Sequence, residues 1–334
     1  MLRPLLLLVF LAAFFPVCGA EPCATATPGC TEWINLDDQA RALVYRTYSL
    51  EKKNSKITRA LIVIHGAGRD ADNYFRTALA ATFLAGAFED TIVISPRFAA
   101  NNGRGCNDKL GPNEINWSCS GDSWRSGGLA TGSSKLTSYD FMDEILRRLA
   151  RKDAFPNLKV IVISGHSAGG QYVTRYQMAN KVHDTLGIPI SYVVSNPSSY
   201  AYLDPERPAG NNNELRPFGD ARNCTTYDNW PYGLKSRSGY TTNISDDQLK
   251  QQLAARGTTY LLGELDILPL GGFDSSCPAM AQGPTRLARG QAFVNYVNQK
   301  YKAQHKVLVI PLCGHNARCM FTAELALPIL FPKL

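Results

Sequence analysis

Short apolar runs that alternate with longer stretches of helical periodicity dominate the chain. Six runs are continuous or nearly so, as buried strands are, whereas a seventh at 42–49 alternates between apolar and polar residues, as an outer strand does. The continuous runs lie at 60–64, 91–95, 159–164, 190–195, 259–262 and 306–310. We expect these six strands to occupy the interior of one twisted, mostly parallel sheet.

Four segments between these runs carry apolar residues three and four positions apart, which predicts amphipathic helices. They are 74–88, 138–151, 169–181 and 285–301. Strands that alternate with helices predict an α/β fold with helices on both faces of the sheet. Two long irregular segments, 97–134 and 200–242, are rich in Gly, Asn, Ser and Pro. We expect them to be loops over the carboxyl edge of the sheet, where open α/β sheets bind ligands.

The first twenty residues have the features of a secretory signal peptide: one positive charge at Arg3, an apolar run, and small residues before position 21. The apolar run is shorter than the roughly 20 residues of a membrane-spanning helix. We therefore expect secretion, or export to a periplasm, and no membrane anchor. The remainder, 21–334, is expected to form a single domain with the two irregular segments as loop insertions.

The distribution of charge and the spacing of the cysteines indicate which ligands the chain is expected to bind. The net charge of +7 comes from scattered lysines and arginines, with no basic run that would follow a phosphate backbone, so nucleic acid is not an expected partner. Eight cysteines beyond the signal segment favour disulfides in an oxidising compartment. Six of the cysteines are expected to pair with a near neighbour in the sequence, as Cys23–Cys30, Cys106–Cys119 and Cys313–Cys319. The remaining two pair by exclusion, as Cys224–Cys277. Their irregular spacings, without a Cys-x-x-Cys pair, argue against a metal site, and we expect no cofactor.

The main chemical motif is the pentapeptide Gly165-His166-Ser167-Ala168-Gly169. It lies between the predicted strand 159–164 and the predicted helix 169–181, so Ser167 is expected on a sharp turn that exposes its hydroxyl. A glycine-rich turn without chemistry is the alternative. A serine nucleophile needs a neighbouring base and donors for the developing oxyanion.

The oxyanion donors are expected to be two backbone amides. One is the amide of Ala168, after the serine, and the other belongs to the loop that follows the strand 60–64, at Ala67 or Gly66. This loop reads His65-Gly66-Ala67-Gly68, whose small residues let the backbone approach a substrate carbonyl. Taken alone, the loop could equally be a tight turn with a structural histidine.

The base is expected late in the chain, where only two histidines are found. His305 precedes the last predicted strand, at the amino edge of the sheet, and we expect it on the surface. His315 follows that strand at the carboxyl edge, where Ser167 also emerges, and is therefore the predicted base. A disulfide between Cys313 and Cys319 would make the His315 loop rigid.

The acid that orients the histidine is expected just beyond the preceding strand, 259–262. Asp266 is our choice. Glu264 and Asp274 remain as alternatives, because spacing does not resolve the turn after that strand.

Together these motifs resemble the α/β-hydrolase superfamily over roughly 42–325. With its signal segment and cysteines, the chain is similar to secreted polyhydroxyalkanoate depolymerases and to feruloyl or acetylxylan esterases. The resemblance implies Ser167 as nucleophile, His315 as base, Asp266 as its orienter, and the amides of Ala67 and Ala168 as oxyanion donors. It implies hydrolysis of a small-molecule or polymeric carboxylic ester. A serine peptidase on the same fold and a non-catalytic, hydrolase-like binding protein are the alternatives.

Further candidates lie on the loops and on the last predicted helix. Aromatic residues of the long loops, which are expected to contact substrate, are Trp117, Trp124, Tyr200 and Trp230. They could stack on a sugar, a phenolic acid or a polyester, and burial as loop anchors is the alternative for each. Arg286 and Arg289 open the helix 285–301; we expect them to be solvated, the alternative being contact with an acidic group or with the Asp266 loop.

Overall fold

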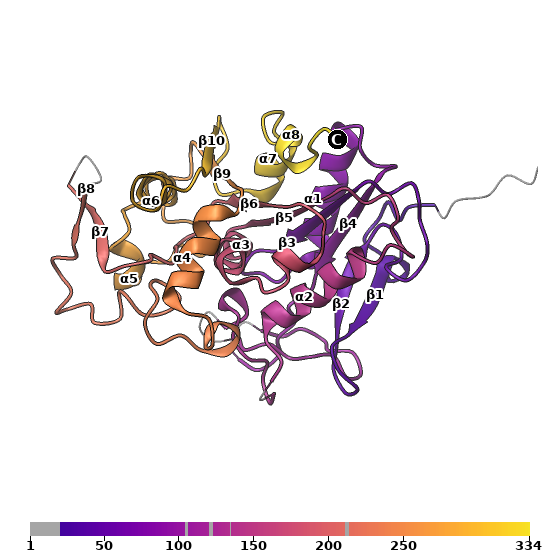
Figure 1. Cartoon of the computed structure of the whole chain (residues 1–334), viewed down its shortest axis with the longest axis horizontal. Coiled ribbons are helices and arrows are strands. Elements are labelled where there is room, and N and C mark those ends of the chain that lie inside the picture. The colour runs from indigo at the N-terminus through magenta and orange to yellow at the C-terminus, as the bar shows by residue number, and fades with distance from the viewer. Residues whose placement is uncertain (1–20, 104–105, 120–122, 134, 211–213) are drawn as a thin grey trace, which may run out of the picture.

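A twisted eight-stranded sheet forms the centre of the molecule (Figure 1), in the order β1-β2-β4-β3-β5-β6-β9-β10. The computed structural model describes residues 21–103, 106–119, 123–133, 135–210 and 214–334; the expected signal peptide lies outside them. β2 pairs antiparallel with β1 and β4, and all other neighbours are parallel. The strands are β1 (Thr31–Asn35), β2 (Arg41–Arg46), β3 (Arg59–Ile64), β4 (Thr91–Pro96), β5 (Val160–His166), β6 (Ile190–Ser195), β9 (Thr258–Gly263) and β10 (Lys306–Ile310).

Helices cover both faces of this sheet, as the sequence predicts (Figure 1). One face packs against α2 (Ser138–Leu149), α3 (Ala168–Ala179), α4 (Asp246–Ala255) and α6 (Arg286–Tyr301), and the other against α1 (Ala71–Leu84), α7 (Ala317–Thr322) and α8 (Leu327–Leu330). Side chains of a strand alternate between the two faces. In β5, accordingly, Ile161 and Ile163 join the core beneath α3, whereas Val162 joins the core beneath α1.

Two expectations about the edges of the sheet are wrong. The segment expected to be an outer strand is β2, which is covered by β1, a strand that the hydrophobic pattern did not predict. The segment expected in the interior at 306–310 is β10, which forms the other edge and pairs only with β9. Lys306 and Val307 are exposed there. An apolar run of five residues therefore does not by itself distinguish an edge strand from an interior one.

The two long segments contain more structure than expected. The segment 200–242 includes an antiparallel ribbon of β7 (Glu206–Ala209) and β8 (Glu214–Pro217), which projects from the left of the molecule in Figure 1. The described part of 97–134 includes one short helix, η2 (Trp124–Ser126). The remaining short helices are η1 (Pro28–Cys30), η3 (His183–Thr185), η4 (Gly239–Thr241) and α5 (Cys277–Met280). No helix of the described residues is long and apolar enough to cross a membrane.

Four disulfides link the cysteines in the pairs that the sequence favours. They are Cys23–Cys30, Cys106–Cys119, Cys224–Cys277 and Cys313–Cys319. The second lies within the 97–134 segment, and the third links the 200–242 segment to the first residue of α5. The fourth encloses the loop between β10 and α7. The disulfides thus add covalent links to loops outside the regular strands of the sheet.

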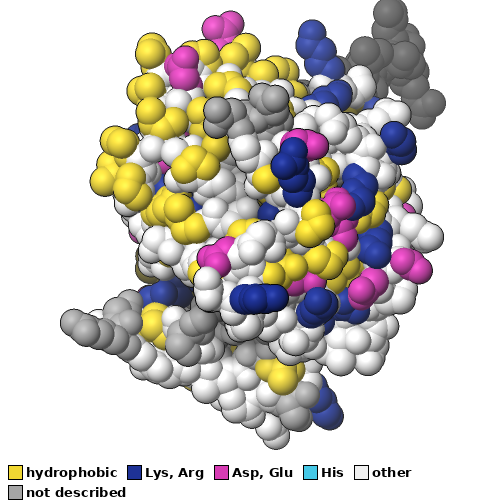
Figure 2. Space-filling model, turned by 90° about the vertical axis from the view of Figure 1, so that its left-hand side faces the viewer, with side chains coloured by type: hydrophobic (Ala, Val, Ile, Leu, Met, Phe, Trp, Pro, Cys, Tyr) yellow, Lys and Arg dark blue, Asp and Glu magenta, His cyan; other side chains and the backbone are white. Residues whose placement is uncertain are grey.

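Exposed hydrophobic side chains are gathered on one part of the surface, at the upper left of the face shown in Figure 2. The loop that follows β9 and the one that follows β10 expose five large hydrophobic side chains: Leu265, Ile267, Leu268, Leu270 and Leu312, which are 49–80% exposed. The two loops are joined by a hydrogen bond from the amide of Leu265 to the carbonyl of Cys313. We call these five residues the apolar loop surface.

Candidate active site

Ser167 occupies a sharp turn between β5, which ends at His166, and α3, which begins at Ala168. Its backbone has φ 59° and ψ −119°, a conformation that residues with side chains rarely adopt. The turn is held by two hydrogen bonds: the Ser167 amide donates to the Ser195 carbonyl at 2.9 Å, and the Gln171 amide donates to the Ser167 carbonyl at 3.0 Å. The strained turn therefore keeps the Ser167 hydroxyl at the carboxyl edge of the sheet.

The glycines on either side of Ser167 allow β5 and α3 to approach each other closely. A Cβ atom on Gly165 would overlap the carbonyl of Gly169, and a Cβ atom on Gly169 would overlap the carbonyl of Ile64 in β3. A side chain at either glycine would therefore crowd this turn.

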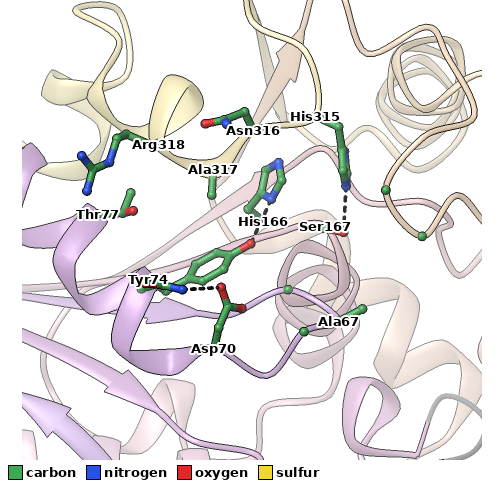
Figure 3. A pocket seen from close by; sticks show the side chains of 15 residues that line it. Ala67, Asp70, Tyr74, Thr77, His166, Ser167, His315, Asn316, Ala317 and Arg318 are labelled. Carbon is green, nitrogen blue, oxygen red and sulfur yellow. Dashed lines mark hydrogen bonds between the residues drawn. The ribbon is translucent and has the colours of Figure 1, made fainter. Parts of the chain in front are cut away.

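A chain of hydrogen bonds joins the predicted nucleophile, base and acid, which come from three different loops. His315 Nε2 lies 2.9 Å from Ser167 Oγ, and His315 Nδ1 lies 2.8 Å from Asp266 Oδ2 (Figure 3 shows His315 above Ser167). Since a carboxylate only accepts, Nδ1–H donates to Asp266, which leaves Nε2 as the acceptor for the serine hydroxyl. Asp266 is 2% exposed. The arrangement can take a proton from Ser167.

The two alternative acids lie elsewhere. Glu264 Oε2 accepts the backbone amide of Leu312 at 2.9 Å, and Asp274 accepts the Tyr232 hydroxyl at 2.8 Å. Of the three carboxylates weighed from the sequence, the structure brings only Asp266 to His315.

The loop after β3 contains a structural histidine and also borders the cavity beside Ser167. His65 is fully buried and its Nε2 accepts the Phe98 amide at 3.1 Å, so Nδ1–H donates to the Gly66 carbonyl at 2.8 Å. Burial lowers the pKa of His65 to about 4, so that the ring is neutral at pH 7. The histidine is thus structural, while Gly66, Ala67 and Gly68 line a cavity beside Ser167.

The proposed oxyanion donors are available to a ligand. Among the described residues, neither the Ala67 amide nor the Ala168 amide donates a hydrogen bond to another group of the protein. Ala168 is the first residue of α3, and amides of a first helical turn lack intrahelical partners and favour negative charge. Both amides therefore keep a donor that is not used within the described part of the protein.

The cavity beside Ser167 has a volume of about 520 Å³ and one strongly polar wall (Figure 3). This wall is built from the first turns of α1 and from the start of α7. Its polar residues are Asp70, Asn73, Tyr74, Thr77, Asn316 and Arg318. The Tyr74 hydroxyl lies 3.1 Å from Nδ1 of His166, and burial holds the pKa of Tyr74 well above its usual value, so it remains protonated.

Sequence reasoning did not predict this polar wall. One sequence feature could have indicated it, since a helix that begins directly after the loop 65–68 must place its first turn next to Ser167.

The four aromatic residues expected to contact substrate do not line this cavity. Trp117, Trp124 and Tyr200 are buried in the core, where Trp124 stacks on Phe98 and Tyr200 stacks on Phe293. Trp230 is half-buried, and its indole N–H donates to the Ser126 carbonyl at 2.9 Å. The structure thus places them as anchors of the long loops, because their large apolar rings gain more from burial than from solvent contact.

Two further expectations about charged side chains are wrong. Arg286 and Arg289 are buried rather than solvated, and Arg286 Nη1 donates to Asp266 Oδ1 at 3.3 Å. His305 is buried rather than at the surface, and its Nε2–H donates to the Leu253 carbonyl of α4 at 2.9 Å. In each case a specific polar partner offsets the cost of burial.

Comparison with known proteins supports the fold. The chain matches no family model, and no curated protein matches it in sequence. Poly(aspartic acid) hydrolase-1 from Sphingomonas sp. KT-1 is similar in structure over 90% of this chain and 97% of its own, with a TM-score of 0.63 and 21% identity. A poly(3-hydroxybutyrate) depolymerase from Bordetella parapertussis is similar over 91% and 90% of the two chains, with a TM-score of 0.62 and 17% identity.

The chain has the α/β-hydrolase fold. The mostly parallel sheet, the helices on both faces and the two structural matches confirm the fold predicted from sequence.

Proposed function

We propose that the protein is a serine hydrolase that cleaves carboxylic esters through an acyl-enzyme. The observation that carries this proposal is the continuous hydrogen-bond chain from Ser167 through His315 to Asp266, beside a cavity that Ala67 also lines. A hydroxyl held beside a base, with donors aimed at a developing oxyanion, is the arrangement that acyl transfer requires.

The steps follow from the geometry. His315 Nε2 removes the proton of Ser167 Oγ as this oxygen attacks the ester carbonyl, and Asp266 stabilises the resulting imidazolium. The amides of Ala67 and Ala168 hold the tetrahedral oxyanion. His315 then gives its proton to the departing alkoxide, which leaves the acyl group on Ser167. Water, deprotonated by the same histidine, releases the acid and restores the serine.

The surface around the cavity supports a polymeric or water-insoluble ester. Gly271 and Gly272 line the cavity, and they lie in the loop that carries Asp266 and most of the apolar loop surface. An apolar patch of this kind, next to an open site, is typical of an interaction surface. Both similar structures, moreover, are of enzymes whose names specify polymeric substrates. Four disulfides support an oxidising, extracytoplasmic destination.

Replacement of the nucleophile tests the proposal. We expect Ser167→Ala to lower kcat on a short p-nitrophenyl ester by roughly 10⁴-fold or more and to abolish labelling by a fluorophosphonate probe. Ser55→Ala, a change at an exposed serine in the segment before β3, is the control and should behave as the parent. Parental rates in Ser167→Ala would refute the proposal. A parent that cleaves peptide amides faster than esters would favour the peptidase alternative, and a parent that does not label would favour a binding protein.

A further inference from the structure

The two carboxylate oxygens of Asp266 have different partners. Oδ2 accepts from His315, at 2.8 Å, and Oδ1 accepts from Nη1 of Arg286, at 3.3 Å. The Asp266 and Arg286 side chains are 1% and 0% exposed, so the ion pair is not screened by water. The acid of the proposed triad is therefore shared between a base and a permanent cation.

The other nitrogens of Arg286 fix the guanidinium against two loops. Nε donates to the Ser198 hydroxyl at 2.7 Å, in the loop after β6, and Nη2 donates to the Gly271 carbonyl at 2.9 Å, in the loop after β9. Because the guanidinium is planar, these contacts also fix the direction in which Nη1 points. Arg286 thus holds Asp266 through the carboxylate oxygen that His315 does not use.

A cation at this position also changes the charge around the base. A buried carboxylate with no other cationic partner strongly favours the protonated form of a neighbouring imidazole. The Arg286 cation neutralises much of the Asp266 charge and repels a positive charge on the neighbouring ring. The other titratable or charged groups that face His315 or share its cavity are His166 at the end of β5, Asp70 and Tyr74 at the start of α1, and Arg318 in α7. His166 is fully buried, and burial holds its pKa well below its usual value, so its ring stays uncharged.

We propose that Arg286 is a positioning residue that fixes Asp266 and sets the pH below which Ser167 loses its base. The inference rests on the proposed function, since it assigns a role within the same triad. Neither the serine motif nor the histidine predicts it from the sequence.

Arg289 provides a matched control, three residues further along α6. It is also fully buried, and its guanidinium donates to the backbone carbonyls of Ser198, Gly283 and Asp274. It has no hydrogen bond to Asp266 among the contacts of the described residues. Loss of Arg289 should therefore disturb the same loops while it leaves in place the cation that is bonded to Asp266.

The experiment measures the rate of fluorophosphonate labelling of Ser167, together with kcat/KM on a soluble ester, from pH 4.5 to 9. Both rates should fall on the acidic side of the pH profile, and we call this fall the acid limb. In Arg286→Met the acid limb of both profiles should shift to higher pH by about 1 unit, the size expected when a charge at this range is removed. Arg286→Lys keeps the charge and should restore the limb to within a few tenths of a unit. Arg289→Met should lose thermal stability but keep the parental limb.

An unchanged limb in Arg286→Met, or an equal shift in Arg289→Met, would overturn the assignment and leave Arg286 with a structural role only. If Arg286→Met does not fold, Arg286→Gln replaces it, because glutamine keeps a donor but not the charge. A parent protein that fails to label at any pH contradicts the proposed function itself. A parent that labels, with a limb that does not depend on Arg286, contradicts only this inference.

Discussion

At the scale of single residues, His65 links folding to pH. The pKa of His65 is about 4 in the folded protein, because burial opposes the charged form, and about 6.5 in the unfolded chain. Between these values the unfolded chain binds the extra proton. The free energy of unfolding therefore falls as the pH drops from 6.5 toward 4 and is fully restored above 6.5. One and a half pH units within this window correspond to about 2 kcal/mol.

We predict that His65→Gln, which can still accept the Phe98 amide, removes this contribution. Between pH 7.5 and pH 5 the parent should lose about 2 kcal/mol more of its unfolding free energy than the variant does, as measured by urea denaturation. His166 and His305 also have lowered pKa values, but they are present in both proteins and cancel in the comparison. An identical pH dependence in the two proteins would show that His65 is not buried in its neutral form.

Some functional residues could be predicted from the sequence and others could not. Ser167 and His315 were predictable because a short motif and the order of the strands limit the choices. The role of Arg286 was not, because an arginine in a first helical turn has the same pattern whether it is solvated or buried. Only the partner that offsets its desolvation, Asp266, distinguishes these states, and that partner is 20 positions away. The burial of Trp117 and Tyr200 likewise depends on contacts with distant residues.

At the scale of elements, the loop between β10 and α7 owes its shape to a disulfide. The Cys313–Cys319 pair encloses His315 in a ring with a sequence separation of 6, and the Asn316 side chain caps α7 by accepting the Cys319 amide at 2.9 Å. We predict that replacing both cysteines by serine lowers kcat on a soluble ester by at least tenfold, because the imidazole loses its fixed position. The unfolding free energy should fall by about 2 kcal/mol, the loop-closure value for so short a ring.

The Cys23–Cys30 pair is the control for this prediction. Its ring is of similar size, with a sequence separation of 7, and it lies next to β2, where the Cys23 amide donates to the Thr47 carbonyl. The corresponding double serine variant should lose a similar amount of stability but retain its kcat. Equal losses of kcat in both variants would indicate that the disulfides act through global stability alone.

The pattern of hydrophobic residues predicted the helices and strands themselves better than it predicted which strands lie side by side in the sheet. All four predicted helices are present within a few residues of their expected ends, and all seven predicted strands belong to the sheet. The pattern did not predict β1, which begins at Thr31 and carries polar residues, or the β7–β8 ribbon, whose residues are largely charged or small. Such strands form through backbone pairing with a partner that is already in place, and this leaves little trace in local hydrophobicity.

At the scale of the whole molecule, the position of the apolar loop surface relates the site to its substrate. Its side chains are mostly exposed, so replacing them costs the folded protein little, whereas docking on an apolar solid would bury them. The measurement is the ratio of two hydrolysis rates, that on a suspended aliphatic polyester divided by that on a soluble p-nitrophenyl ester. We predict that the triple variant Ile267→Ser, Leu268→Ser, Leu270→Ser has a ratio about tenfold lower than that of the parent. This change corresponds to roughly 60 Å² of apolar area lost from the contact.

Two exposed residues elsewhere on the surface provide a control that distinguishes this local effect from non-specific adsorption. Phe83 and Leu84, at the end of α1, are 56% and 62% exposed, and they lie at the opposite end of that helix from the first turn that borders the cavity. The Phe83→Ser, Leu84→Ser variant should keep the parental ratio, because a surface that faces away from Ser167 cannot present an ester to it. A drop of the same size in both variants would mean that binding to the solid is non-specific. An unchanged ratio in the loop variant would indicate that the substrate reaches Ser167 as a soluble molecule, recognised by the polar wall of the cavity.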